Sequence, residues 1–275
     1  MSSSKQRSVL EKVSQLVGKN NKLGKIISGY SKLREANYIS SHFSAYLEAV
    51  VAHDEALKKE VFRIRHHVYC EELGFEPLRE SGMESDEFDA YAKHCLINHT
   101  NSNSFAGTVR IVWPKKDGQQ IPIERYCADS ITNIDLHPSN FSRGEVCEVS
   151  RLAVPKEFRR RKMDEHEGAA LGVINKQTYS DTELRCFPFI AVGLYFAAAA
   201  LVLEERIKHT YVMMEPRLAR SMSFVGIKFE QIGPVVDYHG KRAPYYINQE
   251  LLEQKLSLGF KKMLTDIRKT ISEKH

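Results

Sequence analysis

The sequence of 275 residues lacks most of the features that would place it in a common class of protein. Its five cysteines form no C-x-x-C pair and are odd in number, so a disulfide framework is not expected and a reducing cytoplasm fits best. Residues 1–20 lack the continuous apolar core of a signal peptide, and secretion is therefore not expected. The balance of 40 basic to 35 acidic residues is only mildly positive, and no nucleic-acid-binding motif occurs, so we expect no nucleic-acid partner.

Long apolar runs are also scarce. Residues 186–203 carry no formal charge and are just long enough to raise the question of a membrane span. Four consecutive alanines make the run weakly hydrophobic, Pro188 lies near its start, and Glu204-Glu205-Arg206 ends it. We expect a buried helix of the core, and a transmembrane span is the alternative.

Four short charged runs lie within segments that otherwise have the composition of a protein interior. They are Arg63-Ile64-Arg65, Glu84-Ser85-Asp86-Glu87-Phe88-Asp89, Gly107-Thr108-Val109-Arg110 and Glu148-Val149-Ser150-Arg151. The last two are flanked by β-branched and apolar residues and are predicted to be strands. Strict alternation would place Glu148, Ser150 and Leu152 on one face of a strand, and Val149, Arg151 and Ala153 on the other.

Buried charges need partners, because an unpaired ion in a half-buried sheet costs several kcal/mol. We therefore expect Arg110, Arg151 and Glu148 to meet Arg63 or Arg65 and the acidic pair Asp86 and Asp89 in one ionic cluster. A purely structural cluster is the alternative, although such networks are often replaceable by apolar packing. The retention of so many charges favours a chemical role.

Along the chain, the pattern predicts helices on both sides of a sheet, which is an α/β (α+β) arrangement. Helical segments are expected in residues 1–50 as an N-terminal extension, over 45–73 with an end near Gly74, after Pro216, and at the C-terminus. Strands are expected over 94–99, 105–113, 146–154 and 211–214, with another opening at Gly226. Residues 113–145 are long and irregular and are interpreted as a candidate lid. We expect a main domain over 51–250, followed by an amphipathic helix over 251–275.

Two longer stretches add to the four motifs. One runs from Arg65-His66-His67-Val68-Tyr69-Cys70 to Phe75-Glu76-Pro77, and the other from Met214-Glu215-Pro216 through Tyr238-His239-Gly240-Lys241-Arg242-Ala243-Pro244-Tyr245. Together with Glu148-Val149-Ser150-Arg151-Leu152-Ala153-Val154, they resemble the acyl-homoserine-lactone synthases, the long-chain N-acyl amino acid synthases and, within these relatives, the PEP-CTERM/exosortase-associated acyltransferases. The resemblance covers roughly residues 55–250.

The resemblance implies a GNAT-like mixed central sheet in which two strands splay apart and admit the pantetheine arm of a thioester donor. Those strands should be the ones containing Glu148 and Tyr211. Members that use CoA place a glycine-rich loop after the first of these strands. Here the corresponding residues Arg159, Arg160, Arg161 and Lys162 are cationic, which favours docking of an acidic acyl carrier protein; a solvated basic loop is the alternative. The donor would be the phosphopantetheine thioester, and no permanently bound cofactor is expected.

Amide formation needs a base for the attacking amine and stabilisation of an oxyanion. Glu148 is the candidate base, and Ser150 positions the acceptor or a water, or is a plain strand serine. Arg65, Arg110 and Arg151 would hold the acidic residues, or one of them would bind the carboxylate of the acceptor. Asp86 and Asp89 would fix those arginines or bind the ammonium of the acceptor. Tyr69 and Phe75 would line the pocket or belong to the core.

The expected activity is N-acylation of an amino acid or similar small amine. Alternatives are a homoserine-lactone synthase that uses S-adenosylmethionine, an enzyme with Cys147 as nucleophile, and a non-enzymatic acyl-carrier or lipid-binding module. The protein is expected in the cytoplasm, and peripheral contact of its basic C-terminal helix with the inner face of the inner membrane is left open. No metal is expected, because His66-His67 lacks ligand spacing with other donors.

Overall fold

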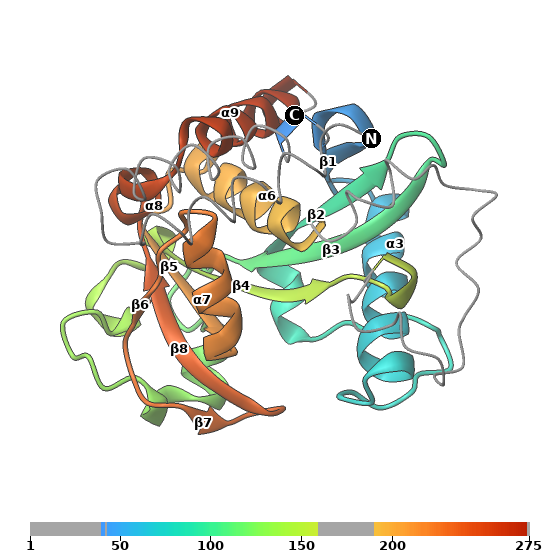
Figure 1. Cartoon of the computed structure of the whole chain (residues 1–275). Coiled ribbons are helices and arrows are strands. Elements are labelled where there is room, and N and C mark those ends of the chain that lie inside the picture. The colour runs from blue at the N-terminus through green and yellow to red at the C-terminus, as the bar shows by residue number, and fades with distance from the viewer. Residues whose placement is uncertain (1–39, 42, 159–189, 274–275) are drawn as a thin grey trace, which may run out of the picture.

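The computed structural model describes residues 40–41, 43–158 and 190–273, and its centre is a mixed β-sheet (Figure 1). The strands follow one another across the sheet in the order β1-β2-β3-β4-β5-β8-β6, and β7 pairs with β8. Their bounds are β1 Leu47–Val51, β2 Ala92–His99, β3 Ser104–Val112, β4 Val146–Ala153, β5 His209–Met214, β6 Glu230–Gln231, β7 Val236–Asp237 and β8 Lys241–Ile247. Neighbouring strands are antiparallel except β4 and β5, which are parallel.

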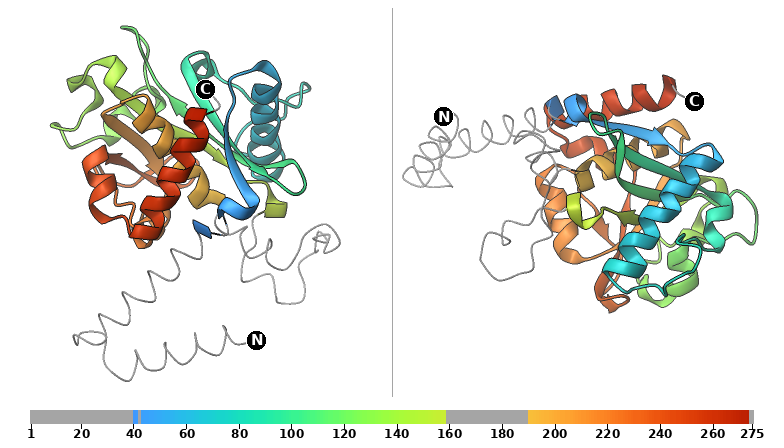
Figure 2. Two further views of the ribbon diagram at one scale, coloured as in Figure 1. Left: turned by 90° about the horizontal axis from the view of Figure 1, so that it is seen from above. Right: turned by 90° about the vertical axis from the view of Figure 1, so that its right-hand side faces the viewer.

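Helices cover both faces of the first half of the sheet (Figure 2). Helix α3, Glu55–Arg65, packs on β2, β3 and β4 through a buried cluster that includes Val61, Ile64 and Leu96. Helix α6, described over Ile190–Glu204, covers the opposite face, where Cys95, Val109 and other strand side chains meet it. Since neighbouring residues of a strand point to opposite faces, the continuous burial of the central parts of β2 and β3 supplies both layers.

The parallel pair of β4 and β5 is short. Val146, Cys147 and Glu148 face His209, Thr210 and Tyr211, and no further pair connects the two strands, although both continue. The expected strands, with Glu148 and Tyr211 at the point of divergence, are thus the ones that separate. The prediction of a mixed α/β sheet with two splayed strands is confirmed.

The helix predicted over 45–73 is wrong at its start. Residues Leu47–Val51 form β1, an edge strand beside β2, and the helix begins only after Asp54, whose carboxylate accepts the N–H of Leu57 at 2.8 Å. A π-helix, His66–Glu72, follows α3 directly. The predicted end is confirmed, because Gly74 adopts φ 61°, which glycine reaches without strain.

Residues 113–145, interpreted as a lid, are packed against the sheet. They contain α4, Pro122–Tyr126, and three 3₁₀-helices, Ala128–Ser130, Pro138–Asn140 and Arg143–Glu145. Ile121 and Ile123 are fully buried in a core cluster with Phe88 and Tyr211, and Arg143 forms an ion pair with Glu124 at 2.7 Å. The segment is therefore a wall of the molecule, and its irregularity in sequence reflects short turns.

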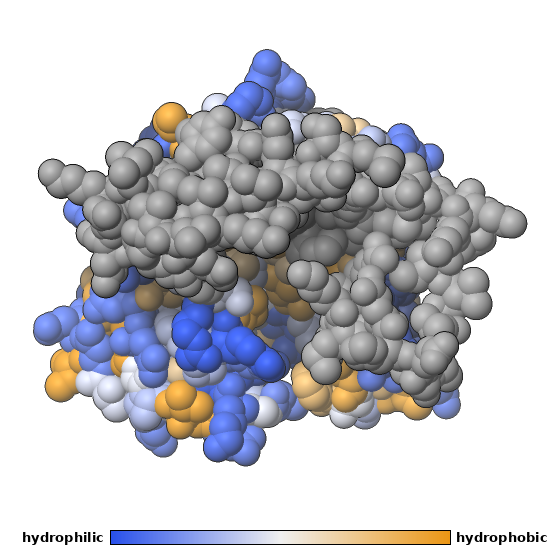
Figure 3. Space-filling model, viewed as in Figure 1, coloured by the Kyte–Doolittle hydropathy of each residue, from blue (hydrophilic) through white to orange (hydrophobic). Residues whose placement is uncertain are grey.

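The C-terminal amphipathic helix is confirmed and is divided into α8, Gln249–Lys255, and α9, Leu258–Glu273. The apolar side of α9 packs on α6 and β1, which places Phe260 against Phe196. Helix α7, Pro216–Phe224, starts at the predicted proline. No helix in the described residues is both long and apolar enough to cross a membrane, and over β7 and β8 the described surface is mostly hydrophilic (Figure 3).

Three predictions lie outside the described residues: the helix at the N-terminal end of residues 1–50, the entry to α6 around Pro188, and the basic residues 159–162. Immediately before the last of these, the short 3₁₀-helix Lys156–Phe158 is anchored by the carboxylate of Glu72, which accepts the N–H of Lys156 at 2.8 Å.

Candidate active site

A polar pocket of about 570 Å³ opens where β4 and β5 separate, on the face of the sheet that carries α3. Strand β4 contributes Glu148, Ser150 and Arg151, and β5 contributes Met213. The rest of the lining comes from the π-helix, the segment around α4, and the turn before β8: Tyr69, Phe75, Glu76, Pro122, Ile123, Cys127, Tyr238, His239 and Arg242. The pocket thus collects five of the residues predicted to form the site.

Glu148 lies at the point where the two strands part and is only 3 % exposed. Burial raises the pKa of its carboxyl to about 8, against the opposing effect of the Ile123 N–H, which donates to Oε2 at 2.7 Å, and of the Arg110 charge. Within the described part of the chain, the other oxygen, Oε1, accepts no hydrogen bond. A carboxylate with a pKa near neutrality and one free oxygen is suited to accept a proton.

The side chains of β4 do not alternate strictly between the two faces as predicted, because the strand is irregular at Arg151. The backbone of Arg151 adopts φ 48°, and the pairing with β3 slips there, because Arg110 faces Ser150 while Thr108 faces Ala153. The extra residue in β4 is a β-bulge, which puts Ser150 and Arg151 on the same side of the sheet. After the bulge, the two side chains lie on the opposite faces from those predicted: Ala153 packs on the α3 side, which is the side of Glu148, and Leu152 packs on the α6 side.

The predicted ionic cluster exists with Glu84 at its centre, but Glu148, which was predicted to belong to it, forms no ion pair with any described residue. The carboxylate of Glu84 is fully buried; it accepts Nε of Arg65 at 2.5 Å and lies 3.3 Å from Nη2 of Arg151. Arg65 also donates to Asp89 at 2.7 Å. Burial opposes ionisation of Asp89, but Arg65 and Arg110 outweigh it and hold the pKa of that carboxyl well below its usual value. The pKa of Glu84 is lowered as well, so Glu84 and Asp89 are charged at neutral pH.

Arg110 joins the cluster to the pocket. Its Nη1 donates to Asp86 at 2.5 Å and to Asp89 at 3.0 Å, while its Nε donates to the hydroxyl of Ser150 at 3.1 Å. Ser150 is thereby held in one orientation on the pocket wall. Asp86 and Asp89 form the capping box of a 3₁₀-helix, Glu87–Tyr91, which fixes both carboxylates against the arginines.

Of the two arginines offered for the cluster by the first motif, Arg65 is inside it and Arg63 is not. Arg63 forms an exposed pair with Glu60 on the outer side of α3. Tyr69 lines the pocket and donates its hydroxyl to the carbonyl of Leu152 at 2.8 Å, which braces the strand just after the bulge. Phe75 is 37 % exposed at the pocket and packs beside His239, with ring centroids 5.6 Å apart.

Sequence reasoning missed several residues of the site. Glu84 lies in the acidic run described above, but the sequence does not distinguish it from Asp86 and Asp89 as a member of the ionic cluster. Glu76, which pairs with Arg151 at 2.9 Å, and Arg242 both lie within stretches that carried the resemblance, but neither follows a buried strand pattern. The Ile123 N–H had no signal in the sequence, because a backbone donor depends only on the path of the chain.

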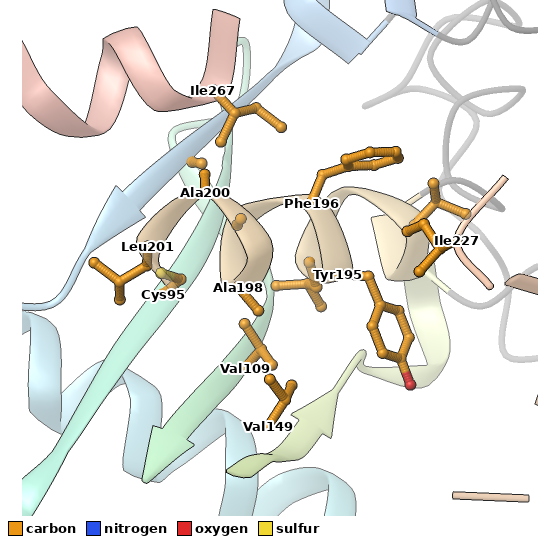
Figure 4. Close-up of a cluster of buried hydrophobic side chains, with 14 of the residues drawn as sticks. Cys95, Val109, Val149, Tyr195, Phe196, Ala198, Ala200, Leu201, Ile227 and Ile267 are labelled. Carbon is orange, nitrogen blue, oxygen red and sulfur yellow. The ribbon is translucent and has the colours of Figure 1, made fainter. Parts of the chain in front are cut away.

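A second pocket, of about 480 Å³, lies on the other face of the sheet at the same opening. Its lining is almost entirely apolar and comes from β4, β5 and α6, with Val149 and Val212 as the strand neighbours of polar-pocket residues. Figure 4 shows Tyr195 and Ala198 on α6 together with Val149 on β4 and Ile227 in the surrounding core. The remaining lining includes Ala199, Val202, Leu203, Phe229 and Leu252.

Two other reactive groups lie away from the polar pocket. Cys147 points into the α6 side of the core, and burial raises the pKa of its thiol to about 12, which argues against a nucleophilic role. His67, Glu72 and Glu157 bring ligand atoms within 4.8 Å of one another on the surface. None of these three lines the pocket, and exposed acidic groups commonly gather without an ion.

Residues 64–167 match the model of the acetyltransferase (GNAT) domain family. The fold is GNAT-like. The AHL synthase LasI superposes with a TM-score of 0.51 at 17% identity, covering 78% of this chain and 98% of that one. The structure of the CoA-dependent acyl-homoserine lactone synthase BjaI, with SAM and isopentyl-CoA, superposes with a TM-score of 0.51 at 17% identity, covering 79% of this chain and 89% of that one. The N-acyl amino acid synthase FeeM from uncultured soil microbes superposes with a TM-score of 0.48 at 15% identity, covering 78% of this chain and 96% of that one. No curated protein sequence matches the chain.

Proposed function

We propose that the protein is an N-acyltransferase that moves a long fatty acyl group from an acyl carrier protein thioester to the amine of an amino acid or related small amine. The observation that carries this proposal is the position of Glu148. This buried carboxylate, with a pKa of about 8, lies between a polar pocket suited to an amine and an apolar pocket suited to an acyl chain.

In this reaction the neutral amine attacks the thioester carbonyl, a C–N bond forms and the C–S bond breaks. Glu148 accepts the proton of the amine, directly or through one water, and the departing thiolate takes up a proton to become the pantetheine thiol. Backbone groups of β4 and β5 beyond Glu148 and Tyr211 have no partner across the opening and are available to the pantetheine arm. Ser150, oriented by Arg110, positions the acceptor or the water.

The acyl carrier protein is proposed as donor because residues 155–163 contain no glycine and several cations, which suit an acidic protein surface better than a pyrophosphate. The resemblance to PEP-CTERM/exosortase-associated acyltransferases points to long acyl chains and a cytoplasmic reaction. CoA is the competing donor.

A homoserine-lactone synthase that acylates S-adenosylmethionine is a second candidate, favoured by the likeness in fold to LasI and BjaI. Both candidates use the same polar pocket and the same base. They differ in the acceptor, and therefore in the product.

The test is an incubation of the purified full chain with acyl-ACP or acyl-CoA and either an amino-acid pool or S-adenosylmethionine, with products read by mass spectrometry. We expect N-acyl amino acids from acyl-ACP. A lactone product would select the second candidate, and unchanged thioester with every acceptor would favour a binding module.

In the same assay, Glu148→Gln should lower turnover at least about 100-fold, because the base is lost while the shape is kept. Its thermal unfolding midpoint and its affinity for acyl-ACP should stay near those of the wild type. Cys147→Ser is the matched control on the neighbouring position of β4 and should retain activity. Wild-type turnover in Glu148→Gln would remove this residue from the chemistry.

A further inference from the structure

Arg242 differs from Arg151, the other arginine that lines the polar pocket, and from Arg65 and Arg110 of the adjacent cluster, in having no carboxylate partner among the described residues. Arg65, Arg110 and Arg151 all pair with carboxylates of the cluster, namely Glu76, Glu84, Asp86 and Asp89. Three guanidinium groups thus face four carboxylates, and the cluster has no positive charge to spare for a ligand. Arg242 lines the same pocket from the start of β8.

The guanidinium of Arg242 is also incompletely hydrogen-bonded. Its Nε is buried, and no described residue accepts a hydrogen bond from it. A buried donor attached to a charged group costs free energy when it is unpaired, so such groups usually have an acceptor in the working state of a protein. An arginine fork matches the geometry of a carboxylate and binds it through two parallel hydrogen bonds.

Its charge is directed into the pocket. Burial raises the pKa values of Tyr69, Cys127 and Tyr195, and the positive charge of Arg242 opposes each of these shifts. Tyr69 and Cys127 line the polar pocket together with Arg242, so the charge of this half-buried residue acts on two groups of the pocket wall.

We propose that Arg242 binds the carboxylate of the acceptor and so restricts the acceptor to α-amino acids, whose amine then lies toward Glu148. This inference rests on the proposed acyltransfer. Among the described residues that line the pocket, Arg242 is an arginine without a carboxylate partner, and Glu76 and Glu148 of the same lining attract the ammonium of the incoming zwitterion. A phosphate dianion would bring a second negative charge toward Glu76 and Glu148, and is disfavoured for that reason.

The experiment compares leucine, leucinamide and 3-methylbutylamine as acceptors for the full chain with acyl-ACP. Rates are expressed per unprotonated amine, because the three amines differ in basicity. We expect wild-type kcat/KM to favour leucine over leucinamide by at least about 30-fold, and Arg242→Gln to reduce that ratio at least about tenfold. Arg242→Lys, which keeps the charge but not the fork, should give an intermediate ratio.

Arg217→Gln is the matched control, since Arg217 is exposed on α7 and its ion pair among the described residues is with Glu215, and it should leave the ratio unchanged. Thermal unfolding of Arg242→Gln checks that it is folded. A wild-type enzyme indifferent to the carboxylate, or an equal loss with leucine and leucinamide in Arg242→Gln, would overturn the inference while leaving the acyltransfer intact. Failure of the wild type to acylate any amine would instead overturn the proposed function.

Discussion

Glu148 is a buried carboxyl group that forms no ion pair with any described residue. Its carboxyl is enclosed by the α4 segment and by β3 and β5, and one backbone N–H is its only hydrogen-bond donor among the described residues. Burial favours the neutral acid, and this accounts for the raised pKa. The pKa values of Glu84 and Asp89 in the ionic cluster shift in the opposite direction, because arginines pair with these two carboxylates.

The pH dependence of catalysis should follow from this pKa. Below pH 8 Glu148 is mostly protonated and cannot accept a proton, so kcat/KM expressed per unprotonated amine should rise with pH and level off above about 8. Steady-state rates measured from pH 6 to 10 with two acceptors of different basicity give the apparent pKa of this profile. The same apparent pKa for both acceptors assigns the ionisation to the enzyme, whereas a pKa that follows the acceptor would contradict the assignment.

At the scale of the elements, the strands with alternating or continuous apolar residues could be predicted from the sequence, and β2, β3, β4 and β5 were. The bulge at Arg151 could not, because it depends on pairing with β3 rather than on composition. The sequence pattern predicts a helix over β1, since Leu47 to Val51 is short and acquires its strand form from the adjacent β2. Most members of the ionic cluster are predictable as charges without local partners, but the sequence does not show that Glu84 is at its centre.

The apolar pocket between α6 and the two separating strands gives a prediction about acyl length. Ala199→Phe would add a large side chain to its wall and fill part of the space of about 480 Å³. We expect long-chain acyl-ACP to lose at least about tenfold in kcat/KM, and short-chain acyl-ACP to be nearly unaffected. Ala199→Ser, similar in volume, is the control, and the measurement is a chain-length series for all three proteins. Equal losses at every length would exclude this pocket as the acyl site.

For the whole molecule, the ionic cluster couples folding to acidity. The pKa values of Glu84 and Asp89 are held below those of an unfolded chain, so their contribution is fully present above the unfolded values of about 4 and is lost as pH falls through the lower folded values. The free energy of unfolding, measured with urea between pH 7 and 3, should therefore fall steeply at the acid end.

Asp89→Asn tests the origin of that slope. The substitution leaves Arg65 and Arg110 with less compensation and should destabilise the fold by about 3 kcal/mol at pH 7. It should also flatten the dependence of stability on pH, since one of the ionising groups is gone. Asp266→Asn, in an exposed pair with Lys262 on α9, is the control and should change stability by less than about 1 kcal/mol. An unchanged acid slope in Asp89→Asn would contradict the account.

The short contact between β4 and β5 has a mechanical consequence. The backbone ladder connects these two strands over only three residue pairs, so widening the opening beyond Glu148 would break no interstrand hydrogen bond. Beyond Glu148 and Tyr211, β4 and β5 can therefore move further apart when only side-chain packing between them changes. If a thioester donor enters this opening, as proposed above, it would supply hydrogen-bond partners to strand backbone that lacks them across the gap, and its binding would then make the two strands less free to move apart.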